Sequence, residues 1–250
     1  MVSNIIGFVL SFFFLMYTTR YLGSESYGIL SFAIAFSSIT IFLADIGIGS
    51  VIIRDIARDK QFTAKYFGNS IILKIILSAI TLLVTAAIGC AFGYPSTTMN
   101  VVYLITLSLI FVSFYGVISS IIQAFEVMEY ISLGSLIYNM TMLICALLAI
   151  YFNVDVYGFA YVYLISSIII VCYYVVVALK KFPLPDLEID LDLCKYLVKE
   201  AIPFGLSTVF IRIYYYIDTL MISLMILNPN EVIGWYNAAY RMVLILSFIP

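Results

Sequence analysis

Charged residues inside long apolar runs are the first candidates for chemistry in this sequence. Each costs free energy to hold in hydrocarbon, so such residues usually face a water-filled cavity or another helix and mark a pathway for a substrate or an ion. Arginine can bind a phosphate through two parallel hydrogen bonds, whereas an aspartate can hold a proton or a cation. The candidates of this kind are Asp45, Lys74, Arg212, Asp218 and Arg241.

Arg212 is the most informative of them, because it lies near the middle of an apolar run and cannot easily reach water. Either it lines an aqueous cavity or it pairs with Asp218, which follows on the same helix about 120° away around the axis. No acidic residue stands three or four positions from Arg212, where a pair within one helix forms most easily. We therefore expect Arg212 to line a cavity.

The other candidates have simpler alternatives. Lys74 can extend along its helix to the cytoplasmic surface. Arg54 can serve to fix the topology and have no further role, and Arg20 can anchor a helix end at the membrane interface. Tyr215 stands in a run of three tyrosines, whose hydroxyl groups could donate to sugar hydroxyls or phosphates or could pack between helices.

Polar residues also recur at helical spacing within the apolar runs. Asp45 is expected in the second span, on nearly the same helical face as Ser31 and Ser38. Two further stripes are Ser108, Tyr115, Ser119 and Gln123 in one run, and Ser135, Asn139 and Met142 in the next. Because polar groups are costly against lipid, we expect these faces to turn inward, where serines often serve only close helix packing.

The elements that must position these residues are transmembrane helices. Hydrophobic residues make up 64% of the 250 residues and charged residues 10%, and apolar runs of about 20 residues are long enough to span a bilayer as helices. The sequence therefore predicts an all-α, polytopic transmembrane helical bundle. Without histidine, and with four scattered cysteines, it offers no metal-binding pattern, so we expect no metal and no cofactor. A formal net charge of −2 gives no reason to expect a nucleic-acid partner.

Seven complete spans are expected, and an eighth begins near Trp235 and runs into the chain end at Pro250, so that the chain looks cut off inside a helix. The seven cover residues 2–19, 28–52, 67–91, 100–122, 132–152, 157–179 and 203–227. Basic residues cluster in the loops after spans two and six, whereas only Arg20 is basic near a membrane end on the opposite side. By the positive-inside rule, the N-terminus and these two loops face the cytoplasm of a cell (inner or plasma) membrane.

Three regions follow from this pattern. Residues 1–180 form a six-helix bundle, residues 181–201 a cytoplasmic linker with a short amphipathic helix that Asp192 could cap, and residues 202–250 the start of a second bundle. The pattern E-x-x-G-x-x-x-x-A opens both span two, at Glu25, and span eight, at Glu231. Its recurrence six helices later fits two bundles in parallel orientation, as in many transporters.

Short motifs occur in a fixed order along the whole chain. They are Arg20-Tyr-Leu-Gly23 with Tyr27-Gly28, Asp45-Ile-Gly47 leading to Arg54, Gln123-Ala-Phe-Glu126, Ile202-Pro203, Ile217-Asp218, and Gly234-Trp-Tyr236 with Ala238-Ala239-Tyr-Arg241. This ordered set resembles the prokaryotic polysaccharide-transporter family, the O-antigen-type flippases of the multidrug/oligosaccharidyl-lipid/polysaccharide exporter (MOP) superfamily. The resemblance implies a MATE-like fold of two six-helix lobes, of which this chain covers the first lobe and the start of the second.

The resemblance also implies a transporter that flips lipid-linked oligosaccharide to the outer leaflet. Its partners would be an isoprenoid-linked oligosaccharide, membrane lipids, glycan-assembly proteins and a coupling ion such as Na⁺ or H⁺. Arginines in a cavity between the lobes would offset the phosphate charge. The candidates for substrate binding and translocation are Arg20, Asp45, Arg54, Lys74, Arg212, Tyr215, Asp218 and Arg241. Since one lobe forms only one wall of such a cavity, we expect that the 250-residue chain does not flip substrate alone.

Three alternatives stay open. The first is an ion-coupled multidrug exporter of the same superfamily, with Asp45 or Asp218 as its cation or proton site, although several arginines favour an anionic substrate. The second is a membrane glycan polymerase or glycosyltransferase, but the short outward loops contain few acids or bases, so we expect no enzyme. The third is a non-transporting remnant of a truncated gene.

Overall fold

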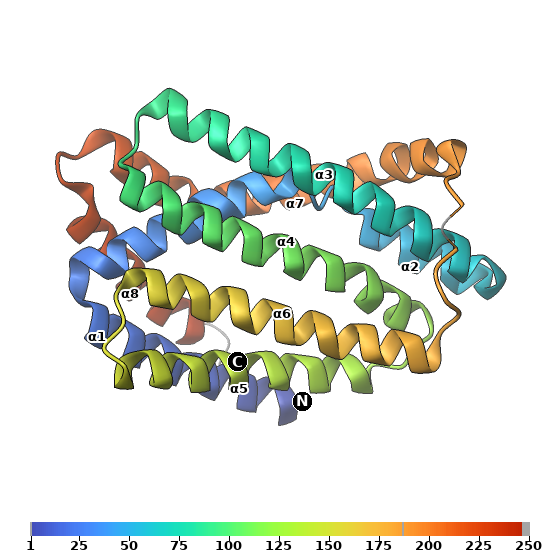
Figure 1. Ribbon diagram of the computed structural model, residues 1–250, viewed down its shortest axis with the longest axis horizontal. Helices are drawn as coiled ribbons and strands as arrows, with labels where there is room; N and C mark the ends of the chain where they lie inside the picture. The colour runs from blue at the N-terminus through green and yellow to red at the C-terminus, as the bar shows by residue number, and fades with distance from the viewer. Residues whose placement is uncertain (1, 187, 247–250) are drawn as a thin grey trace.

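The computed structural model describes residues 2–186 and 188–246, and it consists of long helices that run side by side along the longest axis (Figure 1). The helices are α1 (Val2–Thr40), α2 (Ile48–Arg58), α3 (Thr63–Phe92), α4 (Ser96–Ala124), α5 (Glu129–Tyr151), α6 (Val156–Lys181), α7 (Leu191–Met225) and α8 (Pro229–Leu246), with short 3-10 helices η1 (Ile41–Leu43) and η2 (Lys60–Phe62). No strand occurs among these residues. The all-α prediction is therefore confirmed.

Helix α1 is bent in its middle, at Gly23. Its 39 residues would extend about 58 Å if straight, roughly twice the hydrocarbon thickness of a bilayer. At Gly23 the backbone has φ 69° and ψ 177°, a conformation that glycine adopts at low cost, and the two limbs then run in opposite directions (Figure 1). The limbs correspond to the first two predicted spans. Six helical stretches of the described residues are long and apolar enough to cross a membrane, and the bent α1 is the first of them.

The predicted extent of span two, residues 28–52, is wrong. The helix ends at Thr40, a 3-10 turn follows to Leu43, and a new helix, α2, begins at Ile48. Gly47, the N-cap of α2, has φ 85° and ψ 14°, a left-handed conformation that cannot be part of a continuous right-handed helix. Asp45 consequently lies in a break between helices and not on a helical face shared with Ser31 and Ser38.

Helix α2 is a separate amphipathic helix. Its side chains Ile48, Val51, Ile52 and Ile56 are completely buried, and their spacing places them on one face. The opposite face carries polar residues and ends at the exposed Arg58.

The linker after α6 also differs from the prediction. The expected short amphipathic helix is not separate from span seven, because α7 begins at Leu191 and continues through Pro203 to Met225. Its N-terminal cap is Asp190 and not Asp192: the Asp190 carboxylate accepts hydrogen bonds from the backbone N–H groups of Asp192 and Leu193, both at 3.0 Å. This is the usual way in which an aspartate satisfies the free N–H groups of a first helical turn.

The linker is fixed to the first turns of α3. The Asp186 N–H donates to the carbonyl of Ala64 at 2.9 Å. The Asn69 amide donates to the carbonyl of Glu188 and accepts from the N–H of Asp190. Lys65 forms a 2.6 Å ion pair with Asp190, and this contact holds the pKa of the Asp190 carboxyl below its ordinary value. Contacts on both sides of residue 187 therefore attach the connection to α3.

The repeated E-x-x-G segments contact each other reciprocally. A Cβ atom on Gly28 would lie 1.7 Å from the backbone oxygen of Asn230, and one on Gly234 would lie 2.0 Å from the backbone oxygen of Ser24. Ser24 precedes Glu25 as Asn230 precedes Glu231, so each glycine packs on the residue just before the other copy. Such i-to-j and j-to-i contacts are the signature of two-fold symmetry. The contact is possible because α8 begins at Pro229, earlier than the predicted start near Trp235.

Candidate functional site

Asp45 and Lys74 form an ion pair within the helical bundle. The Lys74 Nζ atom lies 2.7 Å from Asp45 Oδ1. The Lys74 side chain is 2% exposed, whereas the Asp45 side chain is 40% exposed. The alternative in which Lys74 extends to the cytoplasmic surface is therefore wrong. The break after η1 brings the Asp45 carboxylate to α3, so the two charges compensate each other.

Arg212 reaches from α7 to the end of the second limb of α1. Its Nη1 atom donates to the carbonyl of Ser38 at 3.3 Å, and its Nε atom is buried without a hydrogen-bond partner. Asp218 is not its partner, since this carboxylate accepts hydrogen bonds from the Tyr236 hydroxyl and from the backbone N–H of Thr219. No carboxylate forms an ion pair with Arg212 within residues 2–186 and 188–246.

Arg241 reaches inward from α8 into a group of phenols. Its guanidinium group interacts with the phenol of Tyr163, and the phenols of Tyr27 and Tyr216 also act on it electrostatically. The Tyr27 hydroxyl is buried without a hydrogen-bond partner. Arg241, like Arg212, forms no ion pair in the described part of the chain. Hydroxyl groups solvate a guanidinium but do not neutralise it, so its positive charge is uncompensated.

Three neighbouring cavities share these two arginines. The Asp45 cavity, about 210 Å³, is lined by Asp45, Tyr115 and Arg212 among others. The tyrosine cavity, about 110 Å³, is lined by Arg212, Tyr215, Tyr216, Asn237, Tyr240 and Arg241. The Asn139 cavity, about 300 Å³, is lined by Ser11, Phe14, Leu15, Tyr138, Asn139, Met142, Tyr163 and Arg241. Each arginine thus lines two of the cavities, so that the shared arginines connect the three in a row.

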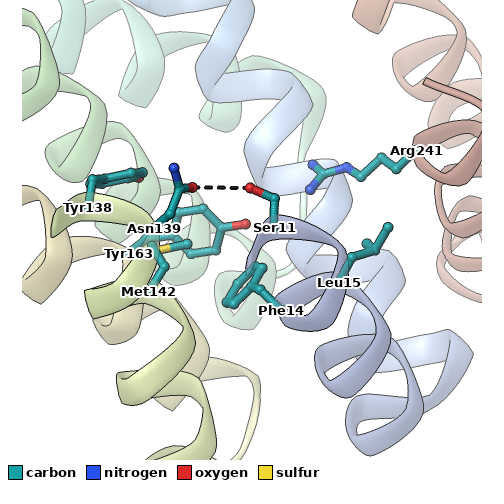
Figure 2. Close-up of a pocket in the computed structure, with 8 residues that line it drawn as sticks. All are labelled: Ser11, Phe14, Leu15, Tyr138, Asn139, Met142, Tyr163 and Arg241. Atoms are coloured by element: carbon teal, nitrogen blue, oxygen red, sulfur yellow. Dashed lines mark hydrogen bonds between the residues drawn. The ribbon is translucent and has the colours of Figure 1, made fainter. Parts of the chain in front are cut away.

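The Asn139 cavity lies between α1, α5, α6 and α8 (Figure 2). Ser11 donates a 3.1 Å hydrogen bond to Asn139 Oδ1, and the rings of Phe14 and Tyr163 meet edge to face at 5.9 Å. Figure 2 shows Arg241 entering from the side opposite to Asn139. One cationic group therefore faces an amide and aromatic rings across the cavity.

Arg20 and Arg54 lie outside this row. Arg20 is exposed near the bend of α1. The guanidinium group of Arg54 contacts Asp55 at 2.8 Å, Glu200 at 3.0 Å and the Tyr196 hydroxyl at 3.0 Å. The hydrogen bonds that Arg54 donates to Asp55 and, next in size, to Glu200 raise the pKa of Arg54. Because its hydrogen-bonding edges are already occupied, Arg54 connects α2 to α7 in this structure.

The structure thus brings together five of the predicted site residues: Asp45, Lys74, Arg212, Tyr215 and Arg241. Asp218 lies beside them, bonded to Tyr236. Sequence reasoning placed Asn139 and Met142 on an inward-facing stripe but did not select Ser11, Tyr138 or Tyr163. The spacing of Ser11, Leu15 and Thr18 places them on one face of the first limb of α1, and this pattern could have indicated that the limb lines the Asn139 cavity.

Comparison with solved structures defines the fold. The MATE multidrug transporter DinF-BH, solved as a complex, superimposes with a TM-score of 0.74 at 16% identity, over 97% of this chain and 58% of that one. An inward-facing MATE-family transporter gives 0.72 at 17% identity over 95% and 58%. A MOP-superfamily transporter from Pyrococcus furiosus gives 0.66 at 16% over 98% and 58%. The chain therefore has the MATE-type fold of the MOP transporters, and it spans a little over half the length of these proteins.

The family follows from the sequence comparison. A family model described as "Polysaccharide biosynthesis protein" matches residues 1–249. The chain belongs to this family, which confirms the membership that its motifs predicted. It is a multi-pass membrane protein. No match is found among curated protein sequences.

Proposed function

We propose that the chain is part of a membrane transporter that flips lipid-linked oligosaccharide or polysaccharide units, joined to an isoprenoid phosphate, from the cytoplasmic to the outer leaflet. The observation that carries this proposal is the pair of arginines, Arg212 and Arg241, that line adjoining cavities and have no carboxylate partner among residues 2–186 and 188–246. Both arginines are half-buried, and a cation that is partly withdrawn from water without a partner is costly. An anionic ligand between the two would remove that cost and would accept several charge-assisted hydrogen bonds.

The surroundings of the arginines also support a phosphate-linked sugar. Tyr215, Tyr216 and Tyr240 line the cavity between them, and phenol groups can donate to phosphate or sugar oxygens while their rings pack on sugar faces. An isoprenoid tail would stay in lipid while the polar head group crosses between two lobes by alternating access. In this proposal the N-terminus is cytoplasmic, glycan-assembly proteins deliver the substrate, and the chain performs no enzymatic step.

An ion-coupled multidrug exporter is the second candidate, and a specific feature favours ion coupling. The carboxylate of Asp218 is held by neutral donors, the Tyr236 hydroxyl and the Thr219 N–H, so a proton or Na⁺ could bind it without displacing an ion pair. The same group can serve the flippase as a coupling site. A cationic drug, however, would be repelled by both arginines.

Equilibrium binding in lipid nanodiscs tests the proposal. The probes are a radiolabelled short isoprenyl diphosphate and a lipophilic organic cation. We expect Arg212→Gln and Arg241→Gln each to weaken isoprenyl diphosphate binding about 10- to 100-fold, since a hydrogen bond to a charged group contributes about 1.5–3 kcal/mol. The matched control is Arg58→Gln, which changes an exposed arginine at the end of α2 and should leave binding unchanged.

Two results would contradict this function. One is an absence of isoprenyl diphosphate binding by the unaltered chain, or binding that survives both arginine substitutions. The other is binding of the organic cation that weakens when Asp218 is replaced by asparagine and is indifferent to Arg212 and Arg241, which would indicate a drug exporter.

A further inference from the structure

The largest of the three cavities in the row is not needed to hold a phosphate. The Asn139 cavity adjoins the tyrosine cavity at Arg241, the residue that the two share. Apart from Arg241, its lining consists of uncharged side chains. It is therefore suited to a neutral polar group that is attached to an anion.

Aromatic rings form much of the wall of the Asn139 cavity. Phe14 and Tyr163 pack edge to face, and Tyr138 lines the same space from α5 (Figure 2). The apolar faces of a pyranose ring pack well on aromatic side chains, while its hydroxyl groups need donors and acceptors at the edges. This combination distinguishes a sugar from a lipid tail, which would leave the polar groups of the wall without partners.

Those donors and acceptors are present and partly unused. The Asn139 amide is oriented by two bonds: Oδ1 accepts from Ser11, and Nδ2 donates to the carbonyl of Ser135 at 2.9 Å. An amide nitrogen has two N–H groups, so one remains free of any acceptor in the described part of the chain. The Tyr138 hydroxyl likewise forms no hydrogen bond among residues 2–186 and 188–246.

The size of the cavity limits the ligand. Small-molecule sites occupy roughly 300–1,000 Å³, and the Asn139 cavity, at about 300 Å³, is at the lower end of this range. One ring fits this size better than an oligosaccharide. Since Arg241 forms the wall next to the tyrosine cavity, a phosphate at the arginines would place the group attached to it at the mouth of the Asn139 cavity.

We propose that the Asn139 cavity is a saccharide subsite that holds one pyranose ring, the sugar joined directly to the phosphate. This inference rests on the proposed function, because it takes the position of the phosphate from Arg212 and Arg241. Such a subsite would let the transporter distinguish a glycosylated isoprenoid phosphate from one without a sugar.

The experiment compares two ligands and two kinds of variant in nanodiscs. The ligands are a short isoprenyl diphosphate and the same molecule joined to one hexose. Tyr138→Phe removes only the unpartnered hydroxyl, and Tyr151→Phe is its matched control on the same helix, with a side chain that is 78% exposed. Asn139→Leu removes the amide, and Met140→Leu is the control for a lipid-facing neighbour, 51% exposed.

We expect Tyr138→Phe and Asn139→Leu each to weaken binding of the glycosylated ligand about three- to tenfold, the contribution of one neutral hydrogen bond, and to leave binding of the sugar-free diphosphate unchanged. Both controls should bind both ligands like the unaltered chain. Arg212→Gln should weaken binding of both ligands.

The outcomes separate the two proposals. If Arg212→Gln weakens both ligands while Tyr138→Phe and Asn139→Leu weaken neither, the saccharide subsite is refuted and the phosphate site stands. Equal weakening of both ligands by the cavity variants also refutes the subsite, because it would reveal a general disturbance of Arg241. If Arg212→Gln weakens neither ligand, the proposed function itself fails.

Discussion

Replacing Asp45 by asparagine should destabilise the chain more than replacing Lys74 by methionine, because the two members of this ion pair are unequally buried. The Lys74 side chain is 2% exposed and the Asp45 side chain 40%. Without Asp45, a buried ammonium loses its only carboxylate partner in the described residues. Without Lys74, the Asp45 carboxylate still faces the cavity that it shares with Arg212.

The size of the difference follows from the cost of unpaired charges. Removing one partner of a fully buried pair costs about 3–5 kcal/mol, and a lone lysine lowers this cost by giving up its proton. We therefore expect about 2–4 kcal/mol for Asp45→Asn. For Lys74→Met the remaining charge stays half-exposed and methionine fills the lysine stem, so we expect about 1 kcal/mol, as for an exposed pair.

Reversible unfolding in mixed detergent micelles, followed by circular dichroism, measures these free energies. The double variant Asp45→Asn, Lys74→Met should be more stable than Asp45→Asn alone, with a coupling energy of about 0.5–3 kcal/mol. Asp192→Asn and Lys195→Met, which change exposed charges at the start of α7, are the matched controls. The reasoning is refuted if Lys74→Met costs as much as Asp45→Asn, or if the double variant is the least stable.

Two further predictions concern contacts at the ends of the helices. Gly28→Ala and Gly234→Ala should each lower the thermal midpoint of unfolding, since their Cβ atoms would meet backbone atoms at 1.7 and 2.0 Å. Because both glycines belong to one shared contact, their effects should be non-additive when combined, and additive effects would contradict the reciprocal contact. Gly116→Ala, with open space around its Cβ position, is the control. The pair of Lys65 with Asp190 lowers the pKa of Asp190, so its stabilisation is present above the ordinary carboxyl pKa of 3.8 and is lost as the pH falls through the lowered value. Hydrogen exchange in the first turn of α7 should therefore stay slow at pH 5 and quicken, beyond its intrinsic pH dependence, only below about pH 4; quickening already at pH 5 would contradict the assignment.

The long helices were predictable because hydropathy and length decide them. Each of the seven expected spans has a counterpart once the limbs of α1 are counted separately. The break after span two was missed because Ile46 and Ile48 continue the apolar run. The sequence did carry a signal for it: Gly47 is followed by Ile48, Val51, Ile52 and Ile56, the spacing of a short amphipathic helix and not of a helix apolar on all sides.

Partners within the site were less predictable, because they come from distant parts of the chain. Lys74 and Asp45 are 29 residues apart, and Ser11 and Asn139 are 128 apart. A helical stripe indicates which face of one helix turns inward, but it does not tell which face of another helix it meets. The position of Arg212 in the middle of a span could likewise be predicted from the sequence, because it depends on one helix only. That Arg212 forms no ion pair with Asp218 could not, because Asp218 binds Tyr236 of another helix.

The formal charges of the site favour a ligand of one or two negative charges. Lys74, Arg212 and Arg241 contribute three positive charges to the cavity row and Asp45 one negative charge, which leaves +2. With ionised Asp218 counted beside the row the balance is +1, and with Asp218 protonated it is again +2. A phosphate or diphosphate linkage supplies compensation of this size, whereas a cationic drug would raise the imbalance. In the proposed function, proton or Na⁺ binding at Asp218 would strengthen phosphate binding, because it neutralises a nearby carboxylate that competes with the phosphate for the positive charge of the arginines. In the proposed function, coupling between ion and substrate would arise from the charge balance of these described residues, without direct contact between the two ligands.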